Sequence, residues 1–510
     1  MNGFIDPRAA HLFEQGLALH RQGALGQALA AYEQALLLQP GQFDLLHHIG
    51  ILAWQAGDLA TAEQFLLVAR ETGDGVSALH GNLGNVFKAG GRLEEALASY
   101  ARALELDRAN VDAWYNYGNT WQALRRFDEA LACYDQALAL QPDDGQAWNN
   151  RAAVLQELGR HGHALHSFDA ALRLQPGNAE AHWNRALLHL RHGRFAEGWR
   201  GYEWRWRVAH LSVSRQRRDF AQPLWLGEQD LAGKTILLHA EQGLGDTLQF
   251  CRYATLAAAR GARVILEVPP TLVGLMHTLA GPSMVVARGE ALPPFDYHCP
   301  LMSLPLAFGS TLDTIPAPPA YLRADAARAA AWTALLGPAE KPRVGLAWRG
   351  SQEHKDDQRR SIDFATLAGL LSPACDFISL QDRHRPEDAA LLAASPVRAF
   401  GERLADFGAT AALCAAMDLV ITVDTSIAHL AGALGKPAWI LLPATTDWRW
   451  LLDRGDSPWY PRARLIRQQP GEPWSAVVAR VRAELDTMTN PAKQRNSMDS
   501  LLLSSDESSR

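Results

Sequence analysis

Three polar segments follow short apolar runs in the second half of the chain, and each carries residues that could do chemistry. The first is EQGLGDTLQFCRY (241–253), which comes directly after the apolar run 234–240. Ligands of α/β folds bind at the carboxyl ends of strands, and Gly245 permits close approach of the backbone to such a ligand. Asp246 is therefore a candidate catalytic carboxylate. The alternative stays open that Asp246 only caps the helix that follows.

The second segment is VDTSIAHLAGALGKP (423–437), again between an expected strand and an expected helix. Asp424, Thr425 and Ser426 can cap that helix, whose free N–H groups and dipole form an anion site suited to a pyrophosphate. His429 lies about one turn further on, near enough to reach a phosphate if the helix begins at Thr425. An ordinary cap followed by a buried structural histidine is the competing interpretation.

The third segment is GLAWRGSQEHKDDQRRSIDF (345–364), an expected strand that runs into a polar loop. Its basic residues are Arg349, Lys355, Arg359 and Arg360. A cation facing a cleft could neutralise a departing nucleotide diphosphate. Acidic residues of the same loop nearly balance this charge, so a solvated loop is an equally good interpretation; they are Glu353, Asp356 and Asp357.

Alternating apolar runs and helical stretches must position these segments. Runs typical of buried strands occur at 234–240, 263–268, 343–348, 376–381, 418–423 and 437–443. A Pro-rich stretch separates the first two runs from the other four and predicts a linker with one helix. We therefore expect two Rossmann-like α/β halves with a cleft between them.

The first two fifths of the chain follow a different rule, a repeat of 34 residues. Windows that start at Ala9, Phe43, Ser77, Val111, Gly145 and Ala179 place the same residue types in register. A small residue stands at position 8 of each window and a large one at position 24, as in Gly16 and Tyr32, which predicts a close contact between two helices. Proline at position 32 ends the second helix in three windows.

This pattern resembles the tetratricopeptide repeat over about residues 9–210, and the resemblance implies helix pairs stacked into a superhelix whose groove binds a peptide or protein. The sixth window departs from the pattern, with Gly198 and Arg205 where alanines are expected. It either caps the stack or docks onto the next domain.

Asparagine recurs at position 6 of four windows, on the first helix of each pair. A ladder of amides can bind the backbone of an extended peptide, because each amide both donates and accepts. Similar ladders mark the repeats of O-GlcNAc transferase, although asparagine is also common at this position without such a role. The ladder consists of Asn82, Asn116, Asn150 and Asn184.

Composition narrows the class of protein further. Apolar residues make up 48% and charged residues 20%, with a net charge of -6, so no global field favours nucleic acid as a partner. Five cysteines without a CxxC pair fit neither a disulfide framework nor a zinc site. We find no signal peptide and no membrane-spanning run, and expect a cytoplasmic protein.

Taken together, GLGDTLQF, WRG with RRSI, and DTSIAHLAGALGKP resemble the ADP-heptose heptosyltransferase family over residues 231 to about 485. The resemblance implies a GT-B glycosyltransferase in which Asp246 is the general base. It implies that Asp424 meets the donor sugar, while Arg360 contacts the diphosphate although the family commonly has lysine there. The remaining residues expected at the donor are Gly245, Trp348, Arg349, Ser361, Gln381, Thr425, Ser426 and His429.

The sequence thus predicts an α plus α/β protein that moves a sugar from a nucleotide-sugar donor, with no catalytic metal or other cofactor, to a protein held by the repeats. The alternative is a non-catalytic scaffold whose degenerate transferase region only binds a ligand or partner. The expected divisions are 1–210 for the repeats, 211–230 for a connector, 231–335 and 336–486 for the two halves, and 487–510 for a disordered tail.

Overall fold

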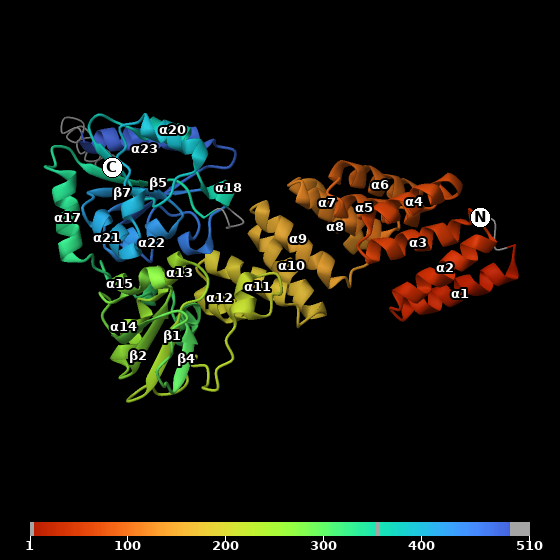
Figure 1. Ribbon diagram of the computed structural model, residues 1–510, viewed down its shortest axis with the longest axis horizontal. Coiled ribbons are helices and arrows are strands. Elements are labelled where there is room, and N and C mark those ends of the chain that lie inside the picture. The colour runs from red at the N-terminus through yellow and green to blue at the C-terminus, as the bar shows by residue number, and fades with distance from the viewer. Residues whose placement is uncertain (1–4, 352–356, 490–510) are drawn as a thin grey trace, which may run out of the picture. The chain divides into compact units, whose positions relative to one another are not determined.

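The computed structural model of the chain describes residues 5–351 and 357–489. They form two compact units that divide between Asn184 and Arg185, and Figure 1 colours them from the N-terminus to the C-terminus.

The first unit is built of helices that pack in antiparallel pairs. Predicted windows and observed helices agree in register, since helices begin at Phe43, Ser77, Val111, Gly145 and Ala179. The helices are α1 Pro7–Arg21, α2 Leu25–Leu38, α3 Phe43–Gln55, α4 Leu59–Gly73, α5 Ser77–Ala89, α6 Leu93–Leu106, α7 Val111–Ala123, α8 Phe127–Leu140, α9 Gly145–Glu157, α10 His161–Leu174 and α11 Ala179–Arg191, which crosses the division between the units.

The predicted small-to-large contact holds each pair together. A Cβ added at Gly16 would lie 2.4 Å from Tyr32, and one added at Gly84 would lie 2.5 Å from Tyr100. Both tyrosines are fully buried. The glycine is therefore required by the close packing of the facing ring.

The second unit contains two parallel sheets. In the first the strand order is β3-β2-β1-β4, and in the second it is β6-β5-β7-β8-β9. The strands are β1 Thr235–His239, β2 Arg263–Val268, β3 Pro282–Ala287, β4 Tyr297–Pro300, β5 Arg343–Ala347, β6 Asp376–Ser379, β7 Leu419–Val423, β8 Ala438–Leu442 and β9 Ala463–Arg467.

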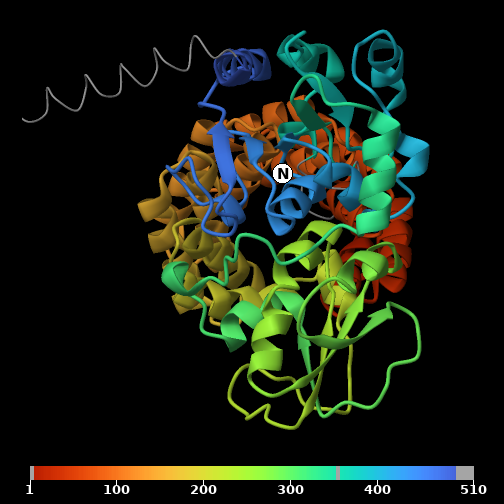
Figure 2. The ribbon, with the colours of Figure 1, turned by 90° about the vertical axis from the view of Figure 1, so that its left-hand side faces the viewer.

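Helices connect and cover these strands (Figures 1 and 2). The helices of the second unit include α12 Phe195–Tyr202, α13 Leu244–Phe250, α14 Tyr253–Ala259, α15 Val273–Met276, α17 Ala326–Leu336, α18 Asp357–Arg360, α19 Phe364–Leu367, α20 Pro386–Ala393, α21 Phe407–Ala415, α22 Ser426–Ala433 and α23 Trp474–Thr489. The core of the second half joins β5 and β7 to α23 through residues such as Leu346, Ile421 and Val481.

Six strands lie where the apolar runs predicted them, and the helix expected in the linker is α17. Three further strands escaped the prediction. β3 starts with a proline and is largely exposed at an edge of its sheet, and β4 has only four residues. β9 contains two arginines among its five residues. Each gives a weak apolar pattern because its environment, and not its composition, makes it a strand.

Two expectations about the ends of domains meet the structure differently. Helix α23 continues to Thr489, so the first residues of the expected disordered tail are helical. The rest of that tail, 490–510, lies outside the described residues. The sixth window docks onto the α/β unit: α12 packs there, and the Trp199 indole N–H donates to the carbonyl of Ser310.

Candidate active site

The carboxyl end of β7 leads directly into α22. Thr425 is the N-cap of this helix, and its Oγ1 accepts a hydrogen bond of 3.3 Å from the Ile427 backbone N–H. The helix begins at Ser426, one residue later than the sequence interpretation assumed. β7 lies beside β5, where the strand order of the second sheet changes direction. Open α/β sheets bind ligands at such a point.

Asp246 lies in the first turn of α13, in the other α/β half. Its Oδ2 accepts a 2.9 Å hydrogen bond from the Gly243 N–H, so the capping interpretation of this residue is satisfied. Its Oδ1 also receives the Arg449 guanidinium. Asp246 therefore caps α13 and, in addition, makes an ion pair with the second half.

Helices α13 and α22 lie against each other, as Figure 1 shows for the green and blue parts of this unit. A Cβ added at Gly245 would lie 2.8 Å from Cδ2 of His429 and 3.6 Å from Cα of Ser426. The two segments that the sequence singled out for catalysis and for phosphate binding thus meet in space.

Two charged residues of this site were missed by the sequence interpretation. Asp447 and Arg449 belong to the segment TTDWRW (445–450), which follows β8. Arg449 donates to Asp447 Oδ1 at 2.9 Å as well as to Asp246. The segment carries only one basic residue and no glycine-rich turn, so its pattern alone gave no sign of a role.

Burial and neighbouring charges shift the pKa of several groups here. Burial, with the nearby Asp447 carboxylate, raises the pKa of Asp424 to about 6 although Arg360 opposes the shift. Burial lowers the pKa of His429 to about 3, which keeps its ring neutral. His429 Nδ1 shares a 2.8 Å hydrogen bond with the Tyr460 hydroxyl. The ring also stacks on Trp450 with centroids 5.4 Å apart.

The third predicted segment reaches the same place through Arg360. Its Nη1 donates a 2.9 Å hydrogen bond to the carbonyl of Asp424, which brings its charge to the end of β7. Ser361 Oγ accepts from the Gly350 N–H at 3.2 Å. Lys355, Glu353 and Asp356 lie outside the described residues.

Trp348 and Arg349 of this segment, and Gln381 after β6, were also predicted at the nucleotide-sugar donor, and they make structural contacts. The Trp348 ring is fully buried and its N–H donates to Asp388. Its side chain therefore offers no surface to a nucleotide sugar. The Arg349 guanidinium is held by both oxygens of Asp388. Gln381 Oε1 accepts from the backbone N–H groups of Trp348 and Arg349, and so fixes the turn after β5.

A buried ion network supports the segment that carries Asp246. Arg205, fully buried, donates through Nε and Nη2 to both oxygens of Glu241, at 3.0 and 2.8 Å. Although burial opposes the cation, the adjacent Glu203 and Glu241 carboxylates raise the pKa of Arg205. Gln242, at φ 60°, donates to the Tyr202 hydroxyl. The residue that departs from the repeat pattern is thus the one that docks the sixth window.

Gln249, one turn after Asp246, is a further polar group that the sequence did not single out. It is fully buried, and neither its amide oxygen nor its amide nitrogen has a hydrogen-bond partner among the described residues. Buried polar groups without a hydrogen-bond partner are rare in native proteins.

The asparagine ladder lies on α5, α7, α9 and α11, with all four residues partly buried. Asn150 donates to the Tyr115 hydroxyl at 3.0 Å and to Asn119 at 2.9 Å, and Asn82 lies 2.9 Å from His47 Nε2. Asn82 and Asn150 are thus held by neighbours within the array, and Asn150 Oδ1 also accepts from the Asn149 amide at 3.4 Å.

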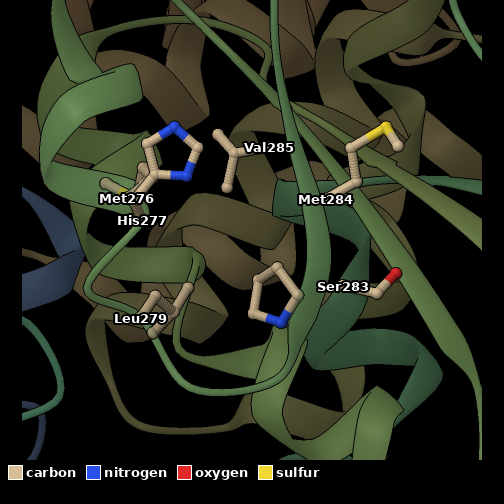
Figure 3. A pocket seen from close by; sticks show the side chains of 7 residues that line it. Met276, His277, Leu279, Ser283, Met284 and Val285 are labelled. Carbon is tan, nitrogen blue, oxygen red and sulfur yellow. The ribbon is translucent and has the colours of Figure 1, made fainter.

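A surface pocket of about 260 Å³ lies between α15 and β3 (Figure 3). It is lined by His277, Ser283, Met284 and neighbouring apolar side chains, and it contains none of the predicted site residues. Nowhere in residues 5–351 or 357–489 does a helix have the length and apolarity that crossing a lipid bilayer requires.

Comparisons with known proteins find family matches in two parts of the chain. Models of the tetratricopeptide repeat match residues 13–76, 84–124 and 118–189. The model of glycosyltransferase family 9, the heptosyltransferases, matches residues 404–474, which include the start of α22 and Arg449. That match does not extend to Asp246 or Arg360.

Protein FlbA of Caulobacter vibrioides is 31% identical over 320 residues, which cover 58% of this chain and 52% of FlbA. The chain thus spans about half the length of this curated relative. Solved structures similar to part of the chain include MamA, with 19% identity, 34% of this chain, 94% of that chain and a TM-score of 0.30. PilF of Pseudomonas aeruginosa has 17% identity, 40% and 92% coverage and a TM-score of 0.36.

By these matches the chain carries tetratricopeptide repeats followed by a region similar to glycosyltransferase family 9, which supports a glycosyltransferase-like function.

Proposed function

We propose that this protein is a GT-B glycosyltransferase that moves a hexose or heptose from a nucleotide-sugar donor to a protein held by its repeats. One observation carries the proposal: Gly245, next to Asp246, packs against Ser426 and His429 of α22. These residues come from opposite halves of the second unit, and Asp246 itself pairs with Arg449 of the second half. The family 9 match over 404–474 supports the same assignment for the donor side.

The reaction is a displacement at the anomeric carbon. The acceptor hydroxyl attacks that carbon, the bond from the carbon to the diphosphate oxygen breaks, and the nucleoside diphosphate leaves with the bond electrons. Asp246 takes the proton of the acceptor hydroxyl as general base. This is the role that the family resemblance implies for it.

The leaving diphosphate needs positive charge and hydrogen-bond donors. The first N–H groups of α22, behind Thr425, supply donors and the positive end of a helix dipole. Arg360, fixed to the carbonyl of Asp424, brings a permanent cation to the same strand end. We propose that these groups carry the leaving-group charge without a metal ion, and that Asp424 meets the donor sugar.

Asp246 variants test the proposal. Purified protein is first screened for thermal stabilisation by ADP, GDP and UDP and their sugars, because a ligand that prefers the folded state raises its Tm. Hydrolysis of the stabilising nucleotide sugar is then compared between the wild type and Asp246→Asn. We expect a loss of about 100-fold or more with unchanged affinity for the nucleoside diphosphate. Asp246→Asn activity equal to that of the wild type would refute the base.

The acceptor side has its own test. Replacing Asn116, Asn150 and Asn184 together by alanine should weaken transfer to a protein acceptor and leave donor hydrolysis intact. Gln146→Ala is the control variant, because Gln146 lies on the same helix as Asn150 and is exposed. Asn149 is unsuitable as a control because it is buried. Unchanged transfer by the triple variant would remove the peptide groove from the proposal.

A second function is favoured by two contacts of Asp246. Both Asp246 oxygens are engaged, by the Gly243 N–H and by Arg449, as in a purely structural cap. A cytoplasmic scaffold that binds a nucleotide sugar but does not turn it over would keep this arrangement. It is supported if the wild type and Asp246→Asn bind the same nucleotide sugar and both fail to hydrolyse it.

A further inference from the structure

Arg449 connects two acidic groups across the contact between the two α/β halves. It makes an ion pair with Asp246 of the first half and another with Asp447 of its own half. The Arg449 side chain is 10% exposed and that of Asp246 is 17% exposed, so the contact between them forms largely away from water. Charge-assisted contacts of this kind are directional and stronger than those at an open surface.

The guanidinium itself is held in place by aromatic packing. Its central carbon lies 4.2 Å from the centre of the Trp448 ring. That ring is buried and packs edge-on against Trp199 and Tyr202 of α12. Arg449 therefore has little freedom to follow Asp246, and Asp246 must be fixed relative to Arg449.

We propose that Arg449 is a positioning residue of the transfer reaction, which holds the Asp246 carboxylate against the start of α22. The inference rests on the proposed function, because it takes Asp246 as the base. It assigns to TTDWRW a role on the acceptor side, where the proton is removed. The donor diphosphate is left to α22 and Arg360.

The Arg449→Gln variant separates this role from a role in binding the donor. Asp447 is 36% exposed and can be solvated when Arg449 is removed, so the fold should survive. We expect kcat for hydrolysis of the nucleotide sugar chosen by the thermal screen to fall about 100-fold, because small displacements of a catalytic group have effects of this size. The Kd for the matching nucleoside diphosphate should stay within twofold.

Conservative replacement and chemical rescue exclude a merely structural effect. Arg449→Lys should recover part of kcat, and millimolar guanidinium should restore activity to an Arg449→Gly variant. Arg454→Gln is the matched control, since Arg454 pairs with Asp456 in the following turn and does not touch Asp246. We expect this control to retain full activity.

A double-mutant cycle tests the contact even if no nucleotide sugar is hydrolysed. Arg449→Gln and Asp246→Asn should each lower the Tm. The Tm of the double variant should be no lower than that of the less stable single variant. Additive shifts would overturn the inference, as would an Arg449→Gln variant with normal kcat or with weakened diphosphate binding alone. Full activity of Asp246→Asn would instead refute the base and leave the measured coupling standing.

Discussion

Gly245 offers a direct test of whether α13 and α22 meet as closely as the site requires. The substitution Gly245→Ala adds one methyl group, whose carbon would lie 2.8 Å from His429 Cδ2. This is about 0.7 Å closer than the nearest favourable separation of two carbon atoms. Gly245 lies in a helix, so alanine suits its backbone and the clash is the only cost.

His429 cannot move away to relieve that clash. Its residue is 4% exposed, its Nδ1 is bound to the Tyr460 hydroxyl, and its ring stacks on Trp450. The strain must therefore be relieved by α13, which carries Asp246. Overpacking of this kind costs about 1–3 kcal/mol of folding free energy.

We expect a lower Tm and a larger loss of catalysis than of stability. Moving Asp246 by a fraction of an ångström from α22 should reduce kcat for nucleotide-sugar hydrolysis by about 10- to 100-fold. Unfolding is followed by urea titration, with activity measured well below the transition. Gly274→Ala is the matched control in the same half, because a Cβ there meets no atom within 4 Å.

A Gly245→Ala variant as stable and as active as Gly274→Ala would contradict this prediction. That result would mean that α13 and α22 do not touch at this position in solution. A variant that loses stability but keeps its kcat would leave the contact intact and refute its importance for Asp246.

Two further predictions concern buried charge. Arg205→Met leaves Glu241 buried without its cation and should cost about 3–5 kcal/mol in urea unfolding, whereas Arg207→Met at an exposed position should cost little; equal costs would contradict the network. The pKa of Asp424 is raised in the folded protein, so Asp424 holds its proton to a higher pH there than in the unfolded chain. The folded protein therefore loses stability as the pH rises from about 4 to about 6. Asp424→Asn should thus be more stable than the wild type at pH 8, by at most about 3 kcal/mol, and no more stable near pH 3.5; a gain independent of pH would exclude this cause.

The repeat unit was predictable because its contacts are local and periodic. The glycine at position 8 and the aromatic residue at position 24 meet within one window, as in Gly16 and Tyr32. Sixteen residues separate them, and the same pair recurs, so the sequence itself displays the contact. Strands β1 and β7 were predictable for a similar reason, since their burial is written into continuous apolar runs.

The site was only partly predictable, because its contacts are distant in sequence. Asp246 and Arg449 are 203 positions apart, and nothing in TTDWRW marks it as the partner of a glycine-rich turn. Trp348 stands at a strand end, as ligand-binding residues do, yet Asp388 on α20 draws its ring into the core. Whether a side chain at a strand end faces a ligand or the interior depends on such neighbours.

The departures of the sixth window gain a physical reason from these contacts. Trp199 and Tyr202 pack on Trp448, next to Arg449, while Arg205 binds Glu241 in the segment that leads to Asp246. An alanine at 205, as the repeat pattern requires, would leave a buried carboxylate without a cation.

Helix α12, the last helix that follows the repeat pattern, and the turn after it therefore support both the segment with Arg449 and the segment with Asp246. A transferase region that began after residue 210, at the end of the periodic sequence, would lack Trp199, Tyr202 and Arg205. Periodicity places the end of the repeats there, whereas packing assigns α12 and the turn after it to the α/β unit, because Trp199 bonds to Ser310 and Arg205 to Glu241 within that unit.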